Sequence, residues 1–282
     1  MTPIISVIIP TFNRRQVLGR AIQSVLDQSM TDFELIIVDD GSDDGTAELL
    51  GELHDPRLRT IFQQNAGVCA ARNSGVAASS SGFVTFLDSD DEAHPEWLQF
   101  YSDAVTSGFR LASCAALFVG PGSQRKVVLP EDSDRAFGCI HARFLAGAFG
   151  IDKDLLLAVG GFREGLRHSE HTDLALRLGG QMLEVPFRYR YINDPLVTMH
   201  RDERPYNPNL QFETAMTLLR EDLVHLQRSR KMHATYAAIA GVAASKLGYH
   251  AEARHLLAMA VRVNPFGVKN YLRLGRQVAF RR

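Results

Sequence analysis

Cysteine is scarce in this sequence, and long apolar runs are missing. Its 282 residues include three cysteines, none in a CxxC pair (Cys69, Cys114 and Cys139). This excludes a disulfide framework and a thiolate zinc site, and it favours a reducing compartment. No stretch approaches the ~18 uninterrupted apolar residues that span a bilayer. The opening residues, MTPIISVIIP, lack the features of a signal peptide. We therefore expect a globular protein of the cytoplasm.

Charge is unevenly distributed along the chain. The formal net charge is −1, but residues 201–282 hold 14 Lys and Arg against 6 Asp and Glu. Residues 1–200 hold 17 against 26. An acidic body suits a site for a metal or cationic groups. The basic tail either meets an anionic surface or forms a solvated helix face, and composition alone favours the second interpretation.

The first hundred residues alternate between strand and helix patterns. Ile4–Ile9 is an apolar, β-branched run, which is typical of a strand buried on both faces. Helical spacing follows over residues 17–26, and Phe33–Val38 is a second apolar run. This predicts a βαβ unit with parallel strands. The alternation continues through a helix near Thr46–Leu53, a strand over Leu58–Phe62, a helix over Val68–Ala77 and a strand over Phe83–Leu87.

After Pro95 the pattern weakens, and residues 111–150 show no clear periodicity. From residue 210 onward the sequence is helical, and Tyr236–Pro265 is similar to one tetratricopeptide-like helical hairpin. Between these regions the residues predict a helix over Lys153–Val159, a break at Gly160–Phe162, a helix with Ser169 as N-cap, and short strands at Pro186–Tyr191 and Leu196–His200.

Polar residues follow the predicted strands where the strands end: Pro10–Asn13, Asp39–Ser42, Gln63–Asn65 and Asp88–Asp91. Parallel sheets bind ligands beyond these carboxyl ends. The last segment, Asp-Ser-Asp-Asp, offers hard oxygen ligands that suit Mg²⁺ or Mn²⁺ together with substrate phosphates. Alone, it could equally form a solvated turn before a helix.

The order and spacing of these motifs resemble family 2 glycosyltransferases, which are inverting enzymes. The matching text is SVIIPTFNRRQVLGRAIQSVLDQSMTDFELIIVDDGSDDGT, then QQNAGVCAARNSGVAASSSGFVTFLDSDDEAHPEWL, and more weakly GGFREGLRHSEHTDLALRL and LVTMHRDERPYN. The resemblance implies an α/β GT-A fold: a Rossmann-like, mostly parallel sheet flanked by helices, here with a C-terminal all-helical extension. We expect a donor half over residues 1–110, an acceptor half over 111–205 and the extension over 206–282.

The resemblance also assigns roles. Asp39 or Asp40 would hydrogen-bond the nucleotide base, with Asp40 preferred, and Arg72 would meet phosphate. Asp90 would hold Mn²⁺ or Mg²⁺, and His200 would complete the coordination unless it is a surface residue. The other expected contacts with the nucleotide-sugar are Pro10, Thr11 and Phe12 at the base, Asn65 and Gly67 near the ribose and pyrophosphate, and Asp88 and Ser89 on the ribose or sugar side.

The catalytic base departs from the family pattern. Family members carry Glu-Asp at the start of the helix after Gly-Gly-Phe, and that Asp is the base. Here Glu170 is followed by His171, with Asp173 two residues on. An imidazole with an ordinary pKa near ~6.5 can accept a proton from a hydroxyl. The open alternatives are a His171 base, a base at Glu170 or Asp173, or a weakened enzyme.

The leading hypothesis is transfer of a sugar from a nucleotide diphosphate, with UDP favoured by the family, to a glycan or lipid-linked hydroxyl in bacterial polysaccharide synthesis. Nucleotidyl transfer is disfavoured because no basic, Gly-rich loop follows the first strand. The alternative is a nucleotide-sugar-binding or scaffolding protein that has lost its base. We expect no nucleic acid partner. The basic segment after Arg262 could lie on an anionic membrane or pack on the body, and packing is the favoured interpretation.

Overall fold

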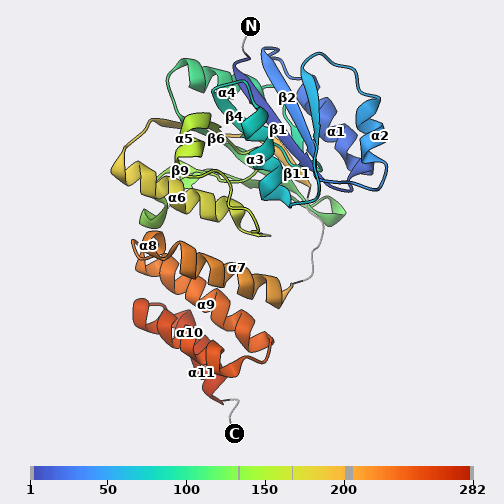
Figure 1. The fold of residues 1–282 in the computed structure, drawn as a ribbon. Helices are drawn as coiled ribbons and strands as arrows, with labels where there is room; N and C mark the ends of the chain where they lie inside the picture. The colour runs from blue at the N-terminus through green and yellow to red at the C-terminus, as the bar shows by residue number, and fades with distance from the viewer. Residues whose placement is uncertain (1–2, 133, 167, 201–205, 280–282) are drawn as a thin grey trace. The chain divides into compact units, whose positions relative to one another are not determined.

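The computed structural model describes residues 3–132, 134–166, 168–200 and 206–279. Within these ranges the fold is α/β, with one nine-stranded sheet in the order β3-β2-β1-β4-β10-β6-β11-β5 and β7 beside β6 (Figure 1). Its strands are β1 (Ile5–Thr11), β2 (Phe33–Asp39), β3 (Leu58–Phe62), β4 (Phe83–Phe86), β5 (Glu92–Ala93), β6 (Leu111–Val119), β7 (Arg125–Val128), β10 (Phe149–Asp152) and β11 (Tyr189–His200).

Most strands of this sheet run in one direction. β3, β2, β1 and β4 are mutually parallel, and β6 and β11 have the same direction because β10 lies antiparallel between β4 and β6. β5, β7 and β10 run the opposite way. The expected mixed, mostly parallel sheet is therefore confirmed. A separate two-stranded sheet pairs β8 (Glu131–Asp132) with β9 (His141–Ala142).

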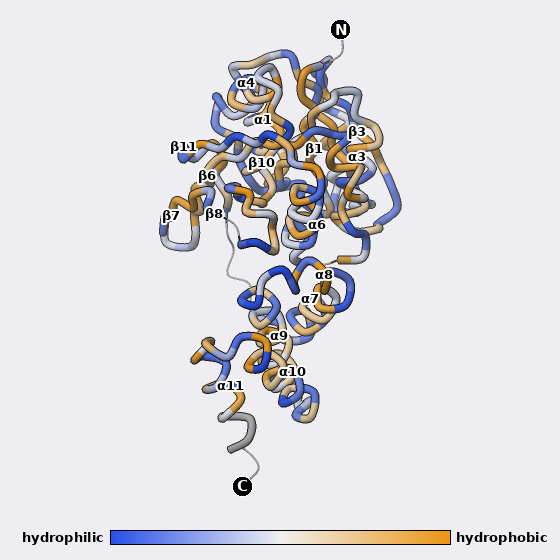
Figure 2. Tube along the Cα trace, turned by 90° about the vertical axis from the view of Figure 1, so that its left-hand side faces the viewer, coloured by the Kyte–Doolittle hydropathy of each residue, from blue (hydrophilic) through white to orange (hydrophobic). Residues whose placement is uncertain are grey.

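Helices cover both faces of the parallel strands. The helices are α1 (Arg15–Leu26), α2 (Thr46–Gly51), α3 (Val68–Ala78), α4 (Trp97–Thr106) and α5 (Lys153–Ala158). Ile5, Val7 and Ile9 of β1 share a core with α1 and α4, whereas Ile8 faces α3. A Cβ on Gly75 would lie 2.5 Å from Ile8, so glycine permits the close approach of α3 to β1. Figure 2 shows hydrophobic residues concentrated along β1. Burial on both faces explains the continuous apolar runs.

The predicted boundaries agree with the structure for the first four strands to within two residues. The expected strands at Pro186–Tyr191 and Leu196–His200 are instead one strand, β11, because the chain stays extended between them. Its register with β6 shifts between Tyr191 and Val197, which breaks the regular alternation. Ser169 precedes the helix as expected, but in a left-handed conformation with φ of 61°, and its carbonyl accepts a bond from the Asp173 N–H (2.9 Å).

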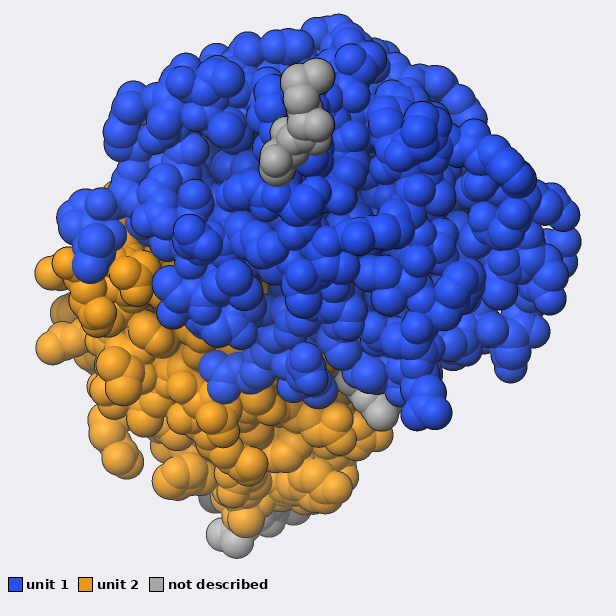
Figure 3. All heavy atoms as spheres, turned by 45° about the horizontal axis from the view of Figure 1, so that its top comes forward, with its two compact units in different colours: residues 1–132, 141–165, 185–203 blue, residues 133–140, 166–184, 204–282 orange. Residues whose placement is uncertain are grey.

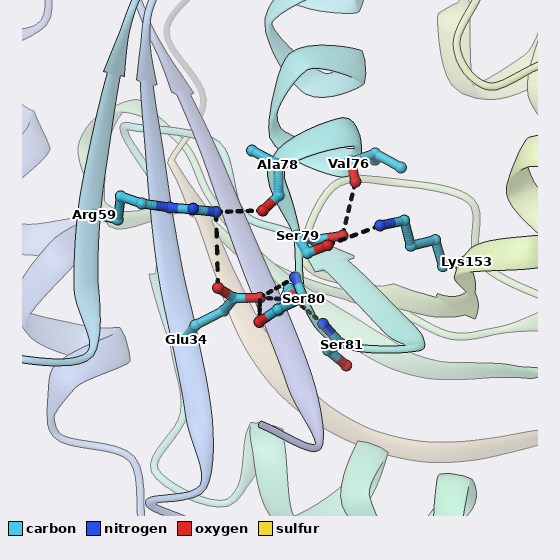
Figure 4. A network of polar contacts seen from close by, with 9 residues as sticks. Glu34, Arg59, Val76, Ala78, Ser79, Ser80, Ser81 and Lys153 are labelled. Atoms are coloured by element: carbon cyan, nitrogen blue, oxygen red, sulfur yellow. Dashed lines mark hydrogen bonds and ion pairs between the residues drawn. The ribbon is translucent and has the colours of Figure 1, made fainter. Parts of the chain in front are cut away.

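A polar network closes the amino-terminal end of the sheet (Figure 4). Glu34 on β2 accepts hydrogen bonds from the Ser6 hydroxyl (2.6 Å) and from the Ser80 backbone N–H (2.6 Å) and hydroxyl (2.8 Å). Arg59 on β3 lies 3.9 Å from the same carboxylate, and Lys153 donates to the Ser79 carbonyl (2.7 Å). Burial alone would raise the pKa of Glu34, but these hydrogen bonds and the charge of Arg59 lower it.

The chain divides into two compact units (Figure 3). Unit 1 comprises residues 1–132, 141–165 and 185–203 and contains the large sheet, whereas unit 2 comprises residues 133–140, 166–184 and 204–282. The expected boundary at residue 205 lies beside the start of the last segment of unit 2. The expected boundary at residue 110 falls inside unit 1, and the helix over residues 170–184 groups with the C-terminal helices.

Unit 2 is helical, with a hydrophobic core of its own. Its helices are α6 (Glu170–Glu184), α7 (Pro208–Glu221), α8 (Leu223–Leu226), α9 (Arg230–Lys246), α10 (His250–Val263) and α11 (Val268–Ala279). Leu176 of α6 packs with Leu218 and Leu256 from the C-terminal helices. In the α9–α10 hairpin a Cβ on Gly241 would lie 2.7 Å from the Leu257 side chain, so small residues allow these helices to approach closely. None of the helices within the described ranges is long and apolar enough to cross a membrane.

Candidate nucleotide-sugar site

The carboxyl ends of β1, β2 and β3 meet in register. Thr11 pairs with Asp39, and Asp39 pairs with Phe62. Past the strand ends, the Asp40 N–H donates to the Thr11 carbonyl (2.9 Å) and the Gln63 N–H donates to the Asp39 carbonyl (3.0 Å). The structure thus brings the first three polar segments of the sequence to one edge of unit 1, as expected for a parallel sheet.

Asp40 organises the loop after β3. Its Oδ1 accepts hydrogen bonds from the Gln63 side-chain amide (2.7 Å) and the Ala66 N–H (2.9 Å), and its Oδ2 accepts one from the Gly67 N–H (2.8 Å). Gly67 has φ of 91°, a conformation that favours glycine, directly before α3. Asp40 therefore already serves three donors of the protein itself.

Asp39 has spare hydrogen-bonding capacity. Its Oδ1 accepts from the Ser42 N–H (3.1 Å) and the Ser42 hydroxyl (2.5 Å), which fixes the turn after β2. No described residue donates to its Oδ2, although the residue is only 2% exposed. The hydroxyl of neighbouring Thr11, a residue 3% exposed, also has no hydrogen-bond partner among the described residues. Buried polar atoms are normally paired, so this pair fits a polar ligand.

Arg72 joins α3 to the end of β4. The side chain is buried, donates to Asp88 Oδ1 (2.8 Å), and places its guanidinium carbon 5.2 Å from the centre of the Phe162 ring. Asn73 holds Phe162 by two bonds, accepting from its N–H (2.9 Å) and donating to its carbonyl (2.8 Å). The Gly-Gly-Phe segment therefore packs against the helix that carries Arg72. The guanidinium and its carboxylate partner together form a preorganised charged pair.

The acidic loop after β4 is tied to the ends of other strands. Asp91 donates its N–H to the Asp88 carbonyl (3.0 Å) and accepts from the His200 N–H (2.9 Å). The Asp90 carbonyl accepts from Arg20 (2.6 Å), and the Asp90 carboxylate lies 4.0 Å from the guanidinium of Arg14. These bonds hold the Asp90 carboxylate at the sheet edge that also carries Asp39.

Asp91 is a site residue that the sequence analysis did not select. Burial, followed by the negative charge of Asp88, raises its pKa to about 8, although the hydrogen bond from the His200 N–H opposes the shift. The available signal was the run of three carboxylates directly after an apolar strand. A cation bound nearby would favour its ionised form.

The donor set suits a divalent ion that also binds phosphate. Within the described part of the chain, no three His, Cys, Asp or Glu side chains converge well enough to hold an ion by themselves. Mg²⁺ and Mn²⁺ bound with a nucleotide need only one or two carboxylates, since the phosphates supply further oxygens. The Asp90 carboxylate meets this requirement. His200 Nε2 forms a 2.7 Å hydrogen bond with Glu92 Oε1. Coordination of the ion by His200 stays a prediction.

The remaining predicted donor residues also lie at strand ends or loops of unit 1. Pro10 is buried within β1, whereas the Phe12 side chain directly beyond β1 is exposed. Asn65 is exposed in the loop that Asp40 holds, and Ser89 is buried in the acidic loop. The fold therefore collects all the predicted donor residues in unit 1.

The three candidates for the catalytic base lie in unit 2, at the start of α6. His171 Nδ1 lies 3.4 Å from Glu170 Oε1, and both side chains are partly accessible. Asp173 is fully buried and accepts a hydrogen bond from Arg177 Nε (3.1 Å). A buried, ion-paired carboxylate is a poor match for a base that must reach a substrate hydroxyl. The geometry within unit 2 thus favours Glu170 and His171 over Asp173.

The comparisons with known proteins agree with this geometry. The model of the family described as Glycosyl transferase family 2 matches residues 6–131. A GalNAc(5)-diNAcBac-PP-undecaprenol beta-1,3-glucosyltransferase of Campylobacter jejuni is 30% identical over 234 residues, covering 78% of this chain and 75% of the relative. The chain belongs to glycosyl transferase family 2. This family 2 chain also matches chondroitin synthase of Escherichia coli, at 29% identity over 188 residues, 62% of this chain and 26% of that protein.

The chain spans less than half the length of several curated relatives, 26% to 46% for four of them. Among solved structures, Staphylococcus aureus TarS residues 1–349 match with a TM-score of 0.66 at 18% identity, covering 94% of this chain and 81% of that segment. The same TarS segment, solved in complex with UDP-GlcNAc, matches with a TM-score of 0.64 at 16% identity, covering 96% of this chain and 89% of that one. The expected glycosyltransferase fold is thereby confirmed.

Proposed function

We propose that this family 2 protein transfers a sugar from a UDP-sugar to a hydroxyl of a bacterial cell-envelope glycan, with inversion at the anomeric carbon. One observation carries the proposal: the buried Thr11 and Asp39 pair has unused hydrogen-bonding atoms at the sheet edge that also carries Asp90 and the ion pair of buried Arg72 with Asp88. This edge offers polar atoms that can bind the nucleotide base and charged groups that can bind the diphosphate.

Asp39, rather than the initially preferred Asp40, accepts the hydrogen bond from the uracil N–H in this proposal. The argument is one of available atoms, because Asp40 already accepts three bonds from the loop after β3. The Thr11 hydroxyl is placed to bond a polar atom of the nucleoside, and the exposed Phe12 ring can stack on the base. The support is the hydrogen-bond inventory of the strand ends.

Arg72 and Asp90 act on the diphosphate. The Arg72 guanidinium, fixed by Asp88, supplies positive charge to the leaving group. The Asp90 carboxylate would hold Mn²⁺ or Mg²⁺, which, when bound, neutralises charge developing on the leaving diphosphate. Asp88 and Ser89 remain proposed contacts for the ribose or the sugar, and Asn65 and Gly67 for the ribose side.

The acceptor oxygen forms its bond to the anomeric carbon while the bond from that carbon to the phosphate oxygen breaks, and UDP leaves with the electron pair. The acceptor proton passes to a base at the start of α6, for which we propose His171, with Glu170 beside it as the second candidate. Support comes from their position after the Gly-Gly-Phe segment, and 13% of the His171 side chain and 15% of the Glu170 side chain are exposed, although His171 Nε2 is buried.

The acceptor and cellular setting are proposed from relatives. The Campylobacter relative is named for a lipid-linked acceptor, and other relatives are named for teichuronic acid and colanic acid biosynthesis. We infer a lipid-linked or polymeric glycan acceptor handled in the bacterial cytoplasm. The three cysteines form no disulfide, which is compatible with that reducing compartment.

The test is turnover of the purified chain with Mn²⁺ and a panel of UDP-, GDP- and dTDP-sugars, with and without lipid pyrophosphate acceptors, measured as nucleotide diphosphate release. The proposal predicts release from a UDP-sugar that increases with acceptor. UDP binding without turnover on any pair would instead support the nucleotide-sugar-binding or scaffolding alternative, and no binding of any nucleotide would reject both.

A further inference from the structure

The last helix of unit 2, α11, has one face packed and the other face open. Leu274 packs against the cluster formed by α9 and α10, and Asn270, one turn earlier, is buried. Residues four apart share a face of a helix, so Asn270 and Leu274 define the packed face. The opposite face of a helix on a globular protein is normally polar.

The outward face of α11 is instead apolar. Val268, Tyr271 and Leu272 fall on it at i, i+3 and i+4 spacing, and Val268 and Leu272 are 70% and 64% exposed. Phe266, two residues before the helix, is 90% exposed. Lys269 and Arg273 flank this stripe and are exposed too. Figure 2 shows hydrophobic and hydrophilic residues side by side along α11. We call these six residues the α11 face.

The charge around the α11 face has a single sign. The sequence contains no Asp or Glu after Glu252. Between Glu252 and Gly275 it contains four basic residues: Arg254, Arg262, Lys269 and Arg273. Arg276, Arg281 and Arg282 continue this basic stretch of the sequence, and the last two lie outside the described residues. An acid-free basic segment with exposed aromatic and aliphatic side chains complements a surface that is anionic and has an apolar interior.

We propose that the α11 face docks on an anionic lipid bilayer. The helix lies parallel to the surface, because its 12 residues span only about 18 Å. Phe266, Val268 and Leu272 enter the boundary between headgroups and acyl chains, while Lys269 and Arg273 pair with lipid phosphates. The sequence alone favoured a packed helix with a solvated basic face; the observed exposure of the apolar stripe reverses that preference. The inference does not require the proposed transferase activity.

The test is sedimentation of the full 282-residue chain with vesicles of phosphatidylglycerol and phosphatidylethanolamine, compared with phosphatidylcholine vesicles. We expect binding to the anionic vesicles that weakens in high salt. The double variant Phe266→Ser with Leu272→Ser should bind at least about tenfold more weakly, because two apolar side chains no longer leave water. Lys269→Ala and Arg273→Ala should each weaken binding about fivefold.

Matched controls separate this surface from general effects. Val224 of α8 is 69% exposed, close to Val268, and Arg220 is an exposed cation at the end of α7. Val224→Ser and Arg220→Ala should bind like the unmodified chain, and all variants should keep its melting temperature because the changed side chains are exposed.

Several results would overturn the inference. These are no sedimentation with anionic vesicles, equal binding to phosphatidylcholine, or unchanged binding by the Phe266 and Leu272 double variant. Light scattering supplies a further outcome: a dimer of the unmodified chain that Leu272→Ser dissociates would assign the α11 face to contact between copies instead.

Discussion

Two adjacent carboxylates at the end of β2 serve different purposes. Asp40 is saturated by the loop over residues 63–67, whereas Asp39 keeps one oxygen without a described donor. Sequence alone could not separate them, because both follow the same apolar run and both would end a strand equally well. The hydrogen-bond partners, which come from a loop more than twenty residues away, make the distinction.

Exchanging each carboxylate for an amide should reveal these roles. In Asp39→Asn, an N–H replaces an acceptor facing the uracil N–H, so UDP affinity should fall about 10- to 100-fold, the range for a lost charge-assisted bond, with little change in melting temperature. In Asp40→Asn, the carboxylate no longer accepts all of its hydrogen bonds from the loop over residues 63–67. The main effect of this variant should therefore be a lower melting temperature. Calorimetric titration measures the UDP affinity, and thermal melts measure the stability of both variants. A larger loss of UDP affinity in Asp40→Asn than in Asp39→Asn would assign the contact with the nucleotide base to Asp40.

The base at the start of α6 should be His171. Because a general base contributes typically 10²–10⁴-fold, His171→Ala should lower kcat by about that factor and leave UDP affinity nearly unchanged. His171→Asp, the usual family residue, should recover part of the rate with a more acidic pH profile. Full turnover in His171→Ala together with inactivity of Glu170→Gln would move the base to Glu170.

Asp91 should make stability depend on pH. Its folded-state pKa of about 8 lies above the ordinary value, so the folded protein binds more protons than the unfolded chain between roughly pH 4 and 8. Stability should therefore fall as pH rises through this range. Asp91→Asn keeps an oxygen for the His200 N–H and should flatten the fall. Melting curves from pH 5 to pH 8 without metal test this, and parallel curves for both proteins would contradict it.

At the level of elements, the sequence predicted the first four strands and the helices of both halves well, and the strands between residues 111 and 200 poorly. The runs that became β1 to β4 are buried on both faces, and such strands leave a continuous apolar signal. Residues 111–150 instead became long β6, short β7 to β10 and single turns, whose contacts are distant in sequence. The joining of two expected strands into β11 depends on pairing with β6, which no local pattern encodes.

The Glu34 network, which joins β1, β2 and β3 to the segment after α3, allows a test at this scale. Its hydrogen bonds lower the pKa of Glu34, so the stabilisation is present above the unfolded pKa and is lost as pH falls through the lower folded pKa. Glu34→Gln should lower the melting temperature at neutral pH by a few degrees and reduce the loss on acidification. Glu52→Gln, which changes an exposed carboxylate after α2, is the control. Equal melting of both variants would show that the network contributes little.

At the level of the whole molecule, the C-terminal helices are more than an appendage. They share a core with α6, and Tyr236 of α9, whose pKa is raised mainly by burial, hydrogen-bonds Thr172 beside His171. The resemblance placed α6 in the acceptor half, residues 111–205, because the weaker family match covers α6 and continues to residues 196–207. The apolar residues of α6 do not specify their partners in sequence, so its grouping with α7 to α10 required the structure.

The central claim is that the carboxyl edge of unit 1 binds UDP with a divalent ion through Asp90. Calorimetric titration of UDP into the chain, with Mn²⁺ or with chelator, tests it most directly. The account predicts Mn²⁺-dependent binding that Asp90→Ala reduces to the affinity seen with chelator, while Asp154→Ala, a change in the first turn of α5, leaves it unchanged. Binding of equal affinity with and without Mn²⁺, or unaffected by Asp90→Ala, would contradict the account.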